Sequence, residues 1–313
     1  MPRVIKFLLK TIVILFIALN IIVAFHAYKF THFYNKGEVF IKPKSGKTTW
    51  DISKEMLFGI NAEKQQNLIP DSFFAQTVLL TAKNNLKLEG WYRTVDSAKG
   101  TIGMFHGHGG KKSGVNKEAA AFRKMGYNTF QLDFRAHGNS EGNTCTIGYD
   151  ESEDVKLVYD HISASGEKNI ILWGISMGAA AVTKSVDDYN LKPRKIILEM
   201  PFGTIEDAVK GRIKMMGLPA QPLTTLITFW GGTENGFWAY GMKPIEYVKT
   251  IKCPVLLQWG AKDPRVTRAE TELLFNNING IKKLVVYENS GHESLCNNEN
   301  AKWTSQVTAF LQK

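Results

Sequence analysis

The sequence predicts an α/β fold with a mostly parallel eight-stranded sheet, helices on both faces and an apolar N-terminal helix. Three observations predict it. Short apolar runs alternate with longer amphipathic segments over most of the chain. Several of these runs end in glycine-rich turns, as buried parallel strands do. Hydrophobic residues make up 44% of the 313 residues and charged residues 22%, which is enough for a sizeable core and argues against a disordered chain.

Residues 11–28 contain no Asp, Glu, Lys or Arg, and only Asn20 and His26 among them are strongly polar. The segment is at the short end for a membrane-spanning helix, but the largely apolar residues 4–9 lengthen it. It is apolar all round, which disfavours a buried helix of a globular domain. Residues 1–30 are therefore predicted to form a transmembrane anchor.

A cleaved secretory signal is the alternative, because it also combines a basic start with an apolar stretch. Ala24 and Ala27 are small residues near the end of the stretch, but Phe25 and His26 disrupt an A-x-A cleavage site. The uncleaved anchor is favoured. Basic residues are nearly balanced on its two sides, and the short tail before it is typical of a signal anchor. The domain that follows is thus expected outside the cytoplasm.

The remaining chain divides into a polar stretch and a folded domain. Residues 31–71, with a short helical pattern at 51–58, are predicted to be a linker that becomes the edge of the domain at 72–313. Strands are predicted at 78–81, 86–92, 101–105, 128–134, 169–173, 195–200, 254–259 and 283–287. Helices are predicted at 117–125, 149–163, 177–187, 268–277 and 301–311. A turn at 83–85 joins the first two strands as an antiparallel pair.

One segment, at about 201–250, interrupts the alternation. It lacks a convincing strand and carries several aromatic residues separated by glycines. In a doubly wound fold, an insertion at the carboxyl end of a strand lies above the ligand crevice. The segment is therefore predicted to be a small helical cap over the site. The alternative is that its aromatic side chains form only the core of the insertion itself.

The pentapeptide GISMG, residues 174–178, lies between a predicted buried strand and a predicted helix. A serine on such a sharp strand-to-helix turn needs small residues two positions to either side, because a Cβ there would collide with the sheet or the helix. The turn presents the Ser176 hydroxyl at the sheet edge, and the helix N-terminus favours developing negative charge. Ser176 is the candidate nucleophile.

A serine nucleophile needs a base, and the base needs an orienting carboxylate. His292 follows the strand predicted at 283–287, and Asp263 follows the strand predicted at 254–259. Both are thus expected at the same sheet edge as Ser176. The alternative is that the histidine is an ordinary surface residue and Asp263, which precedes a proline, starts a turn. Glu293 is a second candidate acid, but a side chain adjacent to His292 points the wrong way to orient its ring.

The glycine-rich sequence FHGHGG follows the strand predicted at 101–105. Such a turn can direct a backbone N–H at a reacting oxygen, so the N–H groups of Met177 and His108 are assigned as the oxyanion donors. His106 and His108 also have the H-x-H spacing of a metal pair, but no third ligand lies nearby in the sequence. No metal and no organic cofactor is expected.

Five motifs, HGHGG, DFRAHGNSEG, GISMG, WGAKDPRV and SGHES, occur in the order and spacing of the α/β-hydrolase superfamily. The sequence resembles that superfamily from about residue 78 to its end. It is most similar to membrane-tethered members that include lipid esterases and thioesterases, and it also resembles the catalytic domain of prolyl oligopeptidase-like peptidases. The resemblance implies that Arg135 and His137 pack beside the site rather than react. Ala136 stands where the family usually has glycine.

The expected reaction is therefore hydrolysis of a carboxylic ester or thioester through a Ser176–His292–Asp263 triad and an acyl-enzyme. The expected partners are a small acyl ester, thioester or lipid substrate, and membrane lipid around the N-terminal helix. Two alternatives stay open: a serine peptidase of prolyl oligopeptidase-like type, and a catalytically silent binding module that keeps the fold. A silent module should have lost at least one member of the triad, and Ser176, His292 and Asp263 are all present.

Charge and cysteine content narrow the remaining classes of function. The net charge is +10, but the lysines are scattered and no basic run lies beside an aromatic nucleic-acid motif. Attraction to an anionic membrane surface is a better explanation of the charge than nucleic-acid binding. The three cysteines, at irregular spacing, form neither a disulfide framework nor a zinc site pattern.

Overall fold

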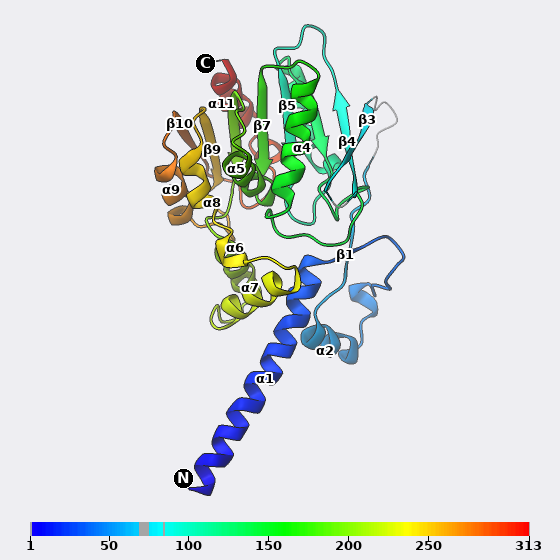
Figure 1. The fold of residues 1–313 in the computed structure, drawn as a ribbon, viewed down its shortest axis with the longest axis vertical. Helices are drawn as coiled ribbons and strands as arrows, with labels where there is room; N and C mark the ends of the chain where they lie inside the picture. Colours follow the sequence, from blue (N-terminus) through cyan, green and yellow to red (C-terminus); the bar gives the residue numbers. More distant parts are fainter. Residues whose placement is uncertain (1, 69–74, 84, 313) are drawn as a thin grey trace.

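The computed structural model describes residues 2–68, 75–83 and 85–312. Its main sheet contains β3 (Gln76–Thr81), β4 (Lys87–Arg93), β5 (Thr101–Phe105), β6 (Asn128–Leu132), β7 (Ile170–Ile175), β8 (Lys195–Glu199), β9 (Val255–Gly260) and β10 (Lys282–Tyr287). The order is β10-β9-β8-β7-β5-β6-β4-β3, and only the β3–β4 and β4–β6 pairs are antiparallel (Figure 1). The predicted eight-stranded, mostly parallel sheet is confirmed. The predicted turn at 83–85 includes residue 84, which lies outside the described residues.

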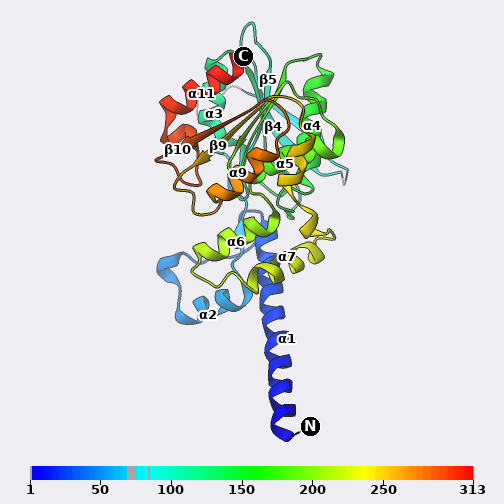
Figure 2. The ribbon, with the colours of Figure 1, turned by 90° about the vertical axis from the view of Figure 1, so that its left-hand side faces the viewer.

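Helices cover both faces of this sheet. They are α3 (Asn116–Lys124), α4 (Glu151–Ala164), α5 (Met177–Tyr189), α9 (Arg268–Asn277), α10 (Leu295–Asn298) and α11 (Asn300–Gln312), with a short 3₁₀ helix η2 (Lys112–Val115) before α3. Figure 2 shows α3 and α11 on one face and α4 and α5 on the other. The first and last residues of each predicted helix lie within two residues of the observed ones. The bounds were predictable because the apolar periodicity and the turn residues on either side are both visible in the sequence.

The carboxyl ends of β5 and β7 are the natural position for a site. The chain runs from β5 outward to β6 on one side, and β7 then lies on the opposite side of β5. Ligands of open α/β sheets bind where the strand order reverses in this way. Every residue of β5 is buried, and so is β7 up to Gly174. The glycine-rich loop after β5 and Ser176 after β7 are therefore held at one edge by fully packed strands.

The helix α1 (Arg3–Thr31) extends away from the sheet, with the N-terminus at its far end (Figure 1). It is longer than the predicted 11–28 because residues 4–9 continue the apolar surface. At 1.5 Å per residue it is about 44 Å long, more than the ~30 Å hydrocarbon thickness of a bilayer. Among the described residues it is the one helix long and apolar enough to cross a membrane, a property that a signal sequence shares.

The stretch after α1 packs against it and against the main domain. It contains β1 (Phe33–Tyr34), η1 (Lys44–Gly46), α2 (Thr49–Phe58) and β2 (Ala62–Glu63), and β1 pairs with β2 in parallel. The Phe58 ring meets Phe25 of α1 edge-on, with centroids 5.2 Å apart. Phe33 is buried in the hydrophobic core. The predicted domain boundary at 71 lies outside the described residues.

The insertion at about 201–250 contains α6 (Ile205–Met215), α7 (Leu223–Glu234), α8 (Pro244–Tyr247) and the 3₁₀ helices η3 (Ala239–Gly241) and η4 (Val248–Thr250). Both views place α6 and α7 beside the end of α1 that adjoins the sheet domain (Figures 1 and 2). Its aromatic residues do not form a single core: Phe202 is buried, whereas the Trp238 side chain is 68% exposed. The helices α6 and α7 form a cap beneath the carboxyl ends of the strands.

Candidate active site

Ser176 lies on the sharp turn between β7 and α5. Its backbone has φ +54° and ψ −118°, a conformation that costs energy for any residue with a side chain. A Cβ on Gly174 would come within 2.6 Å of the Gly178 backbone, and a Cβ on Gly178 within 2.2 Å of the Phe105 carbonyl oxygen. The two glycines therefore allow α5 to begin in direct contact with the strands. The turn holds Ser176 at the N-terminus of that helix.

The structure brings Ser176, His292 and Asp263 together from the loops after β7, β10 and β9. His292 Nδ1 lies 2.7 Å from Asp263 Oδ2, and His292 Nε2 lies 2.8 Å from Ser176 Oγ. Asp263 Oδ1 accepts the backbone N–H groups of Arg265 and Val266, at 2.7 and 3.0 Å. Because an ionised carboxylate only accepts, the ring hydrogen of His292 is assigned to Nδ1. Nε2 is then free to accept from the Ser176 hydroxyl.

Glu293 faces away from this hydrogen-bonded chain. Its Oε1 accepts from the backbone N–H of Gly291, at 2.8 Å, and from Asn298 Nδ2, at 2.5 Å. The side chain therefore holds the loop on which His292 lies and does not contact the imidazole. This is the orientation expected for a residue adjacent to the histidine.

The loop after β5 passes directly beside Ser176. A Cβ on Gly107 would lie 3.4 Å from the Ser176 Cβ, so the backbone of this loop approaches the serine closely. Within the described part of the chain, the backbone N–H groups of His108 and Met177 have no hydrogen-bond acceptor. Two unoccupied donors next to a serine side chain are what an oxyanion site requires.

Two neutral histidines hold this loop in place. The Phe134 N–H donates to His106 Nε2 at 3.2 Å, so His106 Nδ1 donates to the Gly107 carbonyl at 2.8 Å. His137 Nε2 accepts the Gly109 N–H at 3.0 Å. Burial lowers the pKa of His106 to about 3 and that of His137 to about 4, so both rings stay neutral at physiological pH. Among the described residues, no cluster of three or more His, Cys, Asp or Glu side chains forms a possible metal site.

The loop 133–142 supports the site from behind. Arg135 forms an ion pair with Asp154, 2.6 Å away, and a second with Glu153 at 3.0 Å. Ala136 has φ +61°, which explains why glycine is common at this position in the family that the sequence resembles. Arg135 is thus occupied in pairing with α4, and His137 in holding the loop after β5.

Comparison with known proteins agrees with this architecture. A family model described as "Serine aminopeptidase, S33" matches residues 96–233. The chain is 25% identical over 235 residues to the uncharacterized protein YqkD of Bacillus subtilis, covering 72% of this chain and 75% of that one. It is 27% identical over 180 residues to the lysophosphatidylserine lipase ABHD12 of Danio rerio, covering 53% of this chain and 44% of the lipase.

Solved structures decide the fold. The esterase Pf2001 of Pyrococcus furiosus superposes with a TM-score of 0.67 at 22% identity, covering 80% of this chain and 97% of the esterase. An esterase of Exiguobacterium antarcticum superposes with a TM-score of 0.59 at 19% identity, covering 76% of this chain and 100% of the other. The chain has the α/β-hydrolase fold.

A small cavity of about 30 Å³ adjoins the serine. Ser176 and His292 line it. So do several residues that the sequence did not assign to the site, among them Phe30, Arg212 and Arg265. Arg265 lies two residues after Asp263, so its position next to the site was readable from the sequence. Phe30 and Arg212 gave no such signal, because they come from the N-terminal helix and the cap.

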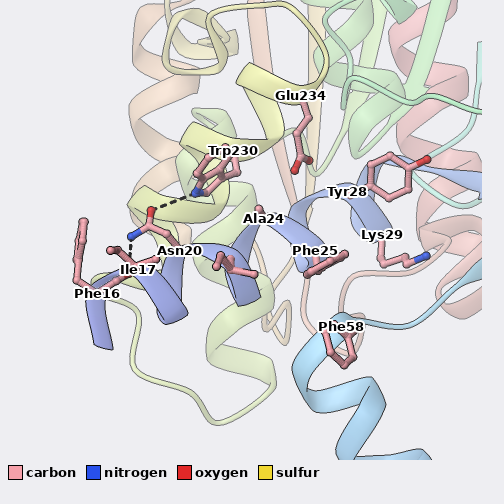
Figure 3. A pocket seen from close by; sticks show the side chains of 11 residues that line it. Phe16, Ile17, Asn20, Ala24, Phe25, Tyr28, Lys29, Phe58, Trp230 and Glu234 are labelled. Carbon is pink, nitrogen blue, oxygen red and sulfur yellow. Dashed lines mark hydrogen bonds between the residues drawn. The ribbon is translucent and has the colours of Figure 1, made fainter. Parts of the chain in front are cut away.

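A larger cavity of about 690 Å³ lies away from Ser176, along the side of α1 (Figure 3). Its walls are α1, the end of α2 and α7, and its lining is almost entirely apolar. Trp230 of α7 donates its indole N–H to Asn20 of α1 at 3.1 Å across this groove. A hydrolysed bond cannot lie here, because no member of the Ser176–His292–Asp263 set lines the groove. We call it the α1 groove.

Proposed function

We propose that this α/β hydrolase is a membrane-tethered serine hydrolase that cleaves carboxylic esters or thioesters of acyl chains. The observation that carries the proposal is the continuous hydrogen-bonded chain from Ser176 Oγ through the His292 ring to Asp263. Ser176 acts as nucleophile, His292 as general base and Asp263 as the carboxylate that orients the ring. The backbone N–H groups of His108 and Met177 form the oxyanion hole.

Acylation begins when Ser176 Oγ attacks the acyl carbonyl carbon and its proton passes to His292 Nε2. The carbonyl oxygen becomes an oxyanion that accepts hydrogen bonds from the His108 and Met177 N–H groups. The oxyanion then reforms the carbonyl, the bond to the alcohol or thiol breaks, and His292 Nε2 returns the proton to the leaving group. The acyl group remains bonded to Ser176.

Deacylation repeats these steps with water. His292 Nε2 removes a proton from water as the water oxygen attacks the acyl carbonyl. The second oxyanion is held in the same place, and its collapse breaks the bond to Ser176 Oγ, which recovers its proton from His292. Asp263 stabilises the imidazolium in both halves of the cycle. The products are a carboxylic acid and a regenerated serine.

A lipid-like acyl substrate is supported by the position of the site. The small cavity at Ser176 is lined by Phe30, near the end of the apolar α1, and the α1 groove runs along the same helix. The similar proteins include one named as a lipase and others named as esterases. These features favour an acyl chain over a polar substrate.

An uncleaved anchor is supported by the contacts of the two polar residues in the apolar stretch. Asn20 bonds to Trp230 of the cap, and the His26 ring lies 2.9 Å from the Met56 carbonyl oxygen of α2. Val23, Ala27 and Thr31 are buried at the base of the helix. A cleaved signal has no reason to make such contacts. We propose that the domain lies on the extracytoplasmic side, the orientation of a signal anchor.

The test is hydrolysis of 4-nitrophenyl esters of increasing acyl length by the full-length protein in nonionic detergent. Ser176→Ala should lower kcat by at least about 10⁴-fold, because it removes the nucleophile. Ser165→Ala, an exposed serine after α4, is the matched control and should retain wild-type activity. Equal activity of the Ser176→Ala and Ser165→Ala variants would exclude the assigned nucleophile.

A peptidase is the second candidate, because the matching family model is described as a serine aminopeptidase. An aminopeptidase must bind the protonated amine of its substrate, which requires a nearby carboxylate. The cavity at Ser176 is lined instead by Arg212 and Arg265, which would repel an ammonium group. Turnover of aminoacyl 4-nitroanilides faster than of any acyl ester would favour the peptidase.

A further inference from the structure

Two arginines from different elements meet at the nucleophile. Arg212 comes from the third turn of α6 in the cap, and Arg265 from the loop after β9. Both line the cavity of about 30 Å³ that Ser176 and His292 also line. Arg265 is held there by its own backbone, because its N–H donates to Asp263 Oδ1 at 2.7 Å. Two positive charges therefore lie beside the predicted reacting carbonyl.

Neither guanidinium has an anionic partner. Among the residues that the structure describes, no carboxylate oxygen lies within ion-pair distance of either one. Arg212 donates from its NH2 group to His108 Nδ1, at 3.1 Å, and its guanidinium lies 4.6 Å from the centre of the Phe30 ring. Arg265 Nε contacts only the Met215 sulfur, at 3.3 Å. The remaining N–H donors of both groups have no hydrogen-bond acceptor in the described part of the chain.

This arrangement is unfavourable in the absence of a ligand. Burial and the charge of Arg265 lower the pKa of Arg212 to about 10. The positive charge of Arg212 is therefore less stable here than in water, although the guanidinium remains protonated at pH 7. Two other arginines do have anionic partners, Arg135 with Asp154 and Arg268 with Glu272. Unpaired cations clustered at a reaction centre are typical of a site whose counter-ion is the substrate.

We propose that Arg212 and Arg265 form a binding site for a phosphate group carried by the acyl ester that Ser176 attacks. The proposal rests on the proposed hydrolase function and specifies its substrate class as a phosphate-bearing acyl ester. A phosphate monoester carries about −1.5 to −2 charges at pH 7. Two guanidinium groups therefore balance a phosphate more closely than they would balance the single charge of a substrate carboxylate. Guanidinium groups also bind phosphate oxygens through paired N–H donors.

The N-terminal helix takes part in this site. The Phe30 ring packs on Arg212 and also stacks on His108, with ring centroids 4.6 Å apart. These contacts fix the direction of the Arg212 guanidinium before a ligand binds, which lowers the entropy cost of binding. The end of α1 and the cap that carries Arg212 thus both contribute to the surroundings of Ser176.

The test compares two substrates that differ only in the phosphate, 1-oleoyl-lysophosphatidate and 1-oleoylglycerol. Oleate release is measured with the full-length protein in dodecyl maltoside micelles at a fixed substrate mole fraction. We expect kcat/KM to be at least tenfold higher for the phosphate-bearing ester. The ratio of kcat/KM for the phosphate-bearing ester over that for 1-oleoylglycerol measures the selectivity. Arg212→Gln and Arg265→Gln should each lower this ratio at least tenfold, mainly through a higher KM for the phosphate-bearing ester. Arg212→Lys should keep part of the selectivity that Arg212→Gln loses.

Arg268→Gln is the matched control, because it removes one positive charge from an exposed arginine that pairs with Glu272. It should keep the wild-type ratio, which separates the local site from general attraction to an anionic micelle. Equal kcat/KM for the two esters in the wild-type protein would overturn the proposal. So would a loss of the ratio in Arg268→Gln as large as in Arg212→Gln.

Direct binding distinguishes failure of this proposal from failure of the hydrolase function. Calorimetry of the Ser176→Ala protein with dodecyl phosphate should show binding that Arg212→Gln abolishes, whether or not any ester is cleaved. Inorganic phosphate should bind at least tenfold more weakly, because it lacks the chain. Tight binding of inorganic phosphate alone, or undiminished binding of dodecyl phosphate by Arg212→Gln, would exclude a lipid phosphate site at these arginines.

Discussion

The side chain of His108 donates its Nε2 hydrogen to the carbonyl oxygen of Phe30, 3.0 Å away. The tautomer follows from its other nitrogen, because Nδ1 accepts from the always protonated guanidinium of Arg212. One imidazole thus joins the end of the apolar helix to the cap and to the loop beside Ser176. Burial holds the pKa of His108 well below its usual range, so the ring stays neutral and the link persists across physiological pH.

The first prediction concerns Phe30. In Phe30→Ala the carbonyl that accepts from His108 remains, and only the ring on Arg212 and His108 is lost. We expect kcat/KM for an acyl ester to fall about tenfold, since an aromatic contact of this kind contributes about 1–2 kcal/mol. Phe7→Ala, on the same helix with a side chain 69% exposed, is the matched control and should keep wild-type kinetics. Equal losses in both variants would mean that α1 acts only as an anchor.

The second prediction concerns the turn that carries Ser176. In Gly178→Ala the new Cβ would lie 2.2 Å from the Phe105 carbonyl oxygen, so either α5 or β5 must move. We expect the variant to lose at least about 3 kcal/mol of stability, measured by chemical denaturation, or to fail to fold. In Gly231→Ala, in α7, nothing lies within 4 Å of the new Cβ. That variant should be neutral or more stable by up to about 1 kcal/mol.

The main sheet and the helices on its faces were predictable because each depends on local sequence. Residues 101–105 are a short apolar run followed by glycines, and the strand found there has the same bounds. The placement of Ser176, Asp263 and His292 at one edge followed from the parallel order alone, and their roles remain a proposal. Local patterns carry such information because a strand and the turn after it are continuous in sequence.

The rest of the site could not be read from the sequence because it depends on how distant segments pack. Phe30 falls within the predicted anchor, and Arg212 falls within the predicted cap. Both reach the serine only because α7 packs against the base of α1 and α6 packs against α7. The short β1–β2 pair was also missed, since two-residue strands carry no periodicity. Packing of apolar surfaces over this separation has no local signature.

The third prediction concerns the α1 groove. Ala24 lines it, and from Phe16 to Lys29 the groove follows α1 for about 20 Å, enough for much of a fatty acyl chain. If the groove guides that chain, Ala24→Phe should lower the ratio of kcat/KM for 4-nitrophenyl palmitate over the butyrate about tenfold. Ala18→Phe adds the same ring at an exposed position of the same helix outside the groove. It should keep the wild-type ratio, and a shift as large as that of Ala24→Phe would show that the groove does not select chain length.

The last prediction concerns Glu199, a fully buried carboxyl at the end of β8. The indole N–H groups of Trp173 and Trp303 donate to its Oε1, at 2.9 and 2.7 Å, and its Oε2 has no partner among the described residues. Burial, with a smaller contribution from the charge of Glu118, raises the pKa of Glu199 to about 8. The carboxyl is therefore protonated and neutral in the folded protein at pH 7.

A carboxyl whose pKa is raised on folding keeps its proton in the folded chain while the unfolded chain releases it. Stability should consequently fall as the pH rises from about 4.5 to about 8, the usual and the folded pKa of this group. Glu199→Gln removes that titration. Its Tm should therefore lie close to that of wild type at pH 5, fall less than that of wild type between pH 5 and pH 9, and exceed that of wild type at pH 9. Glu246→Gln, whose side chain is 53% exposed, should parallel the wild-type Tm at every pH. Parallel Tm curves for Glu199→Gln and wild type would show that Glu199 does not titrate in this range, and that the decline with pH has another source.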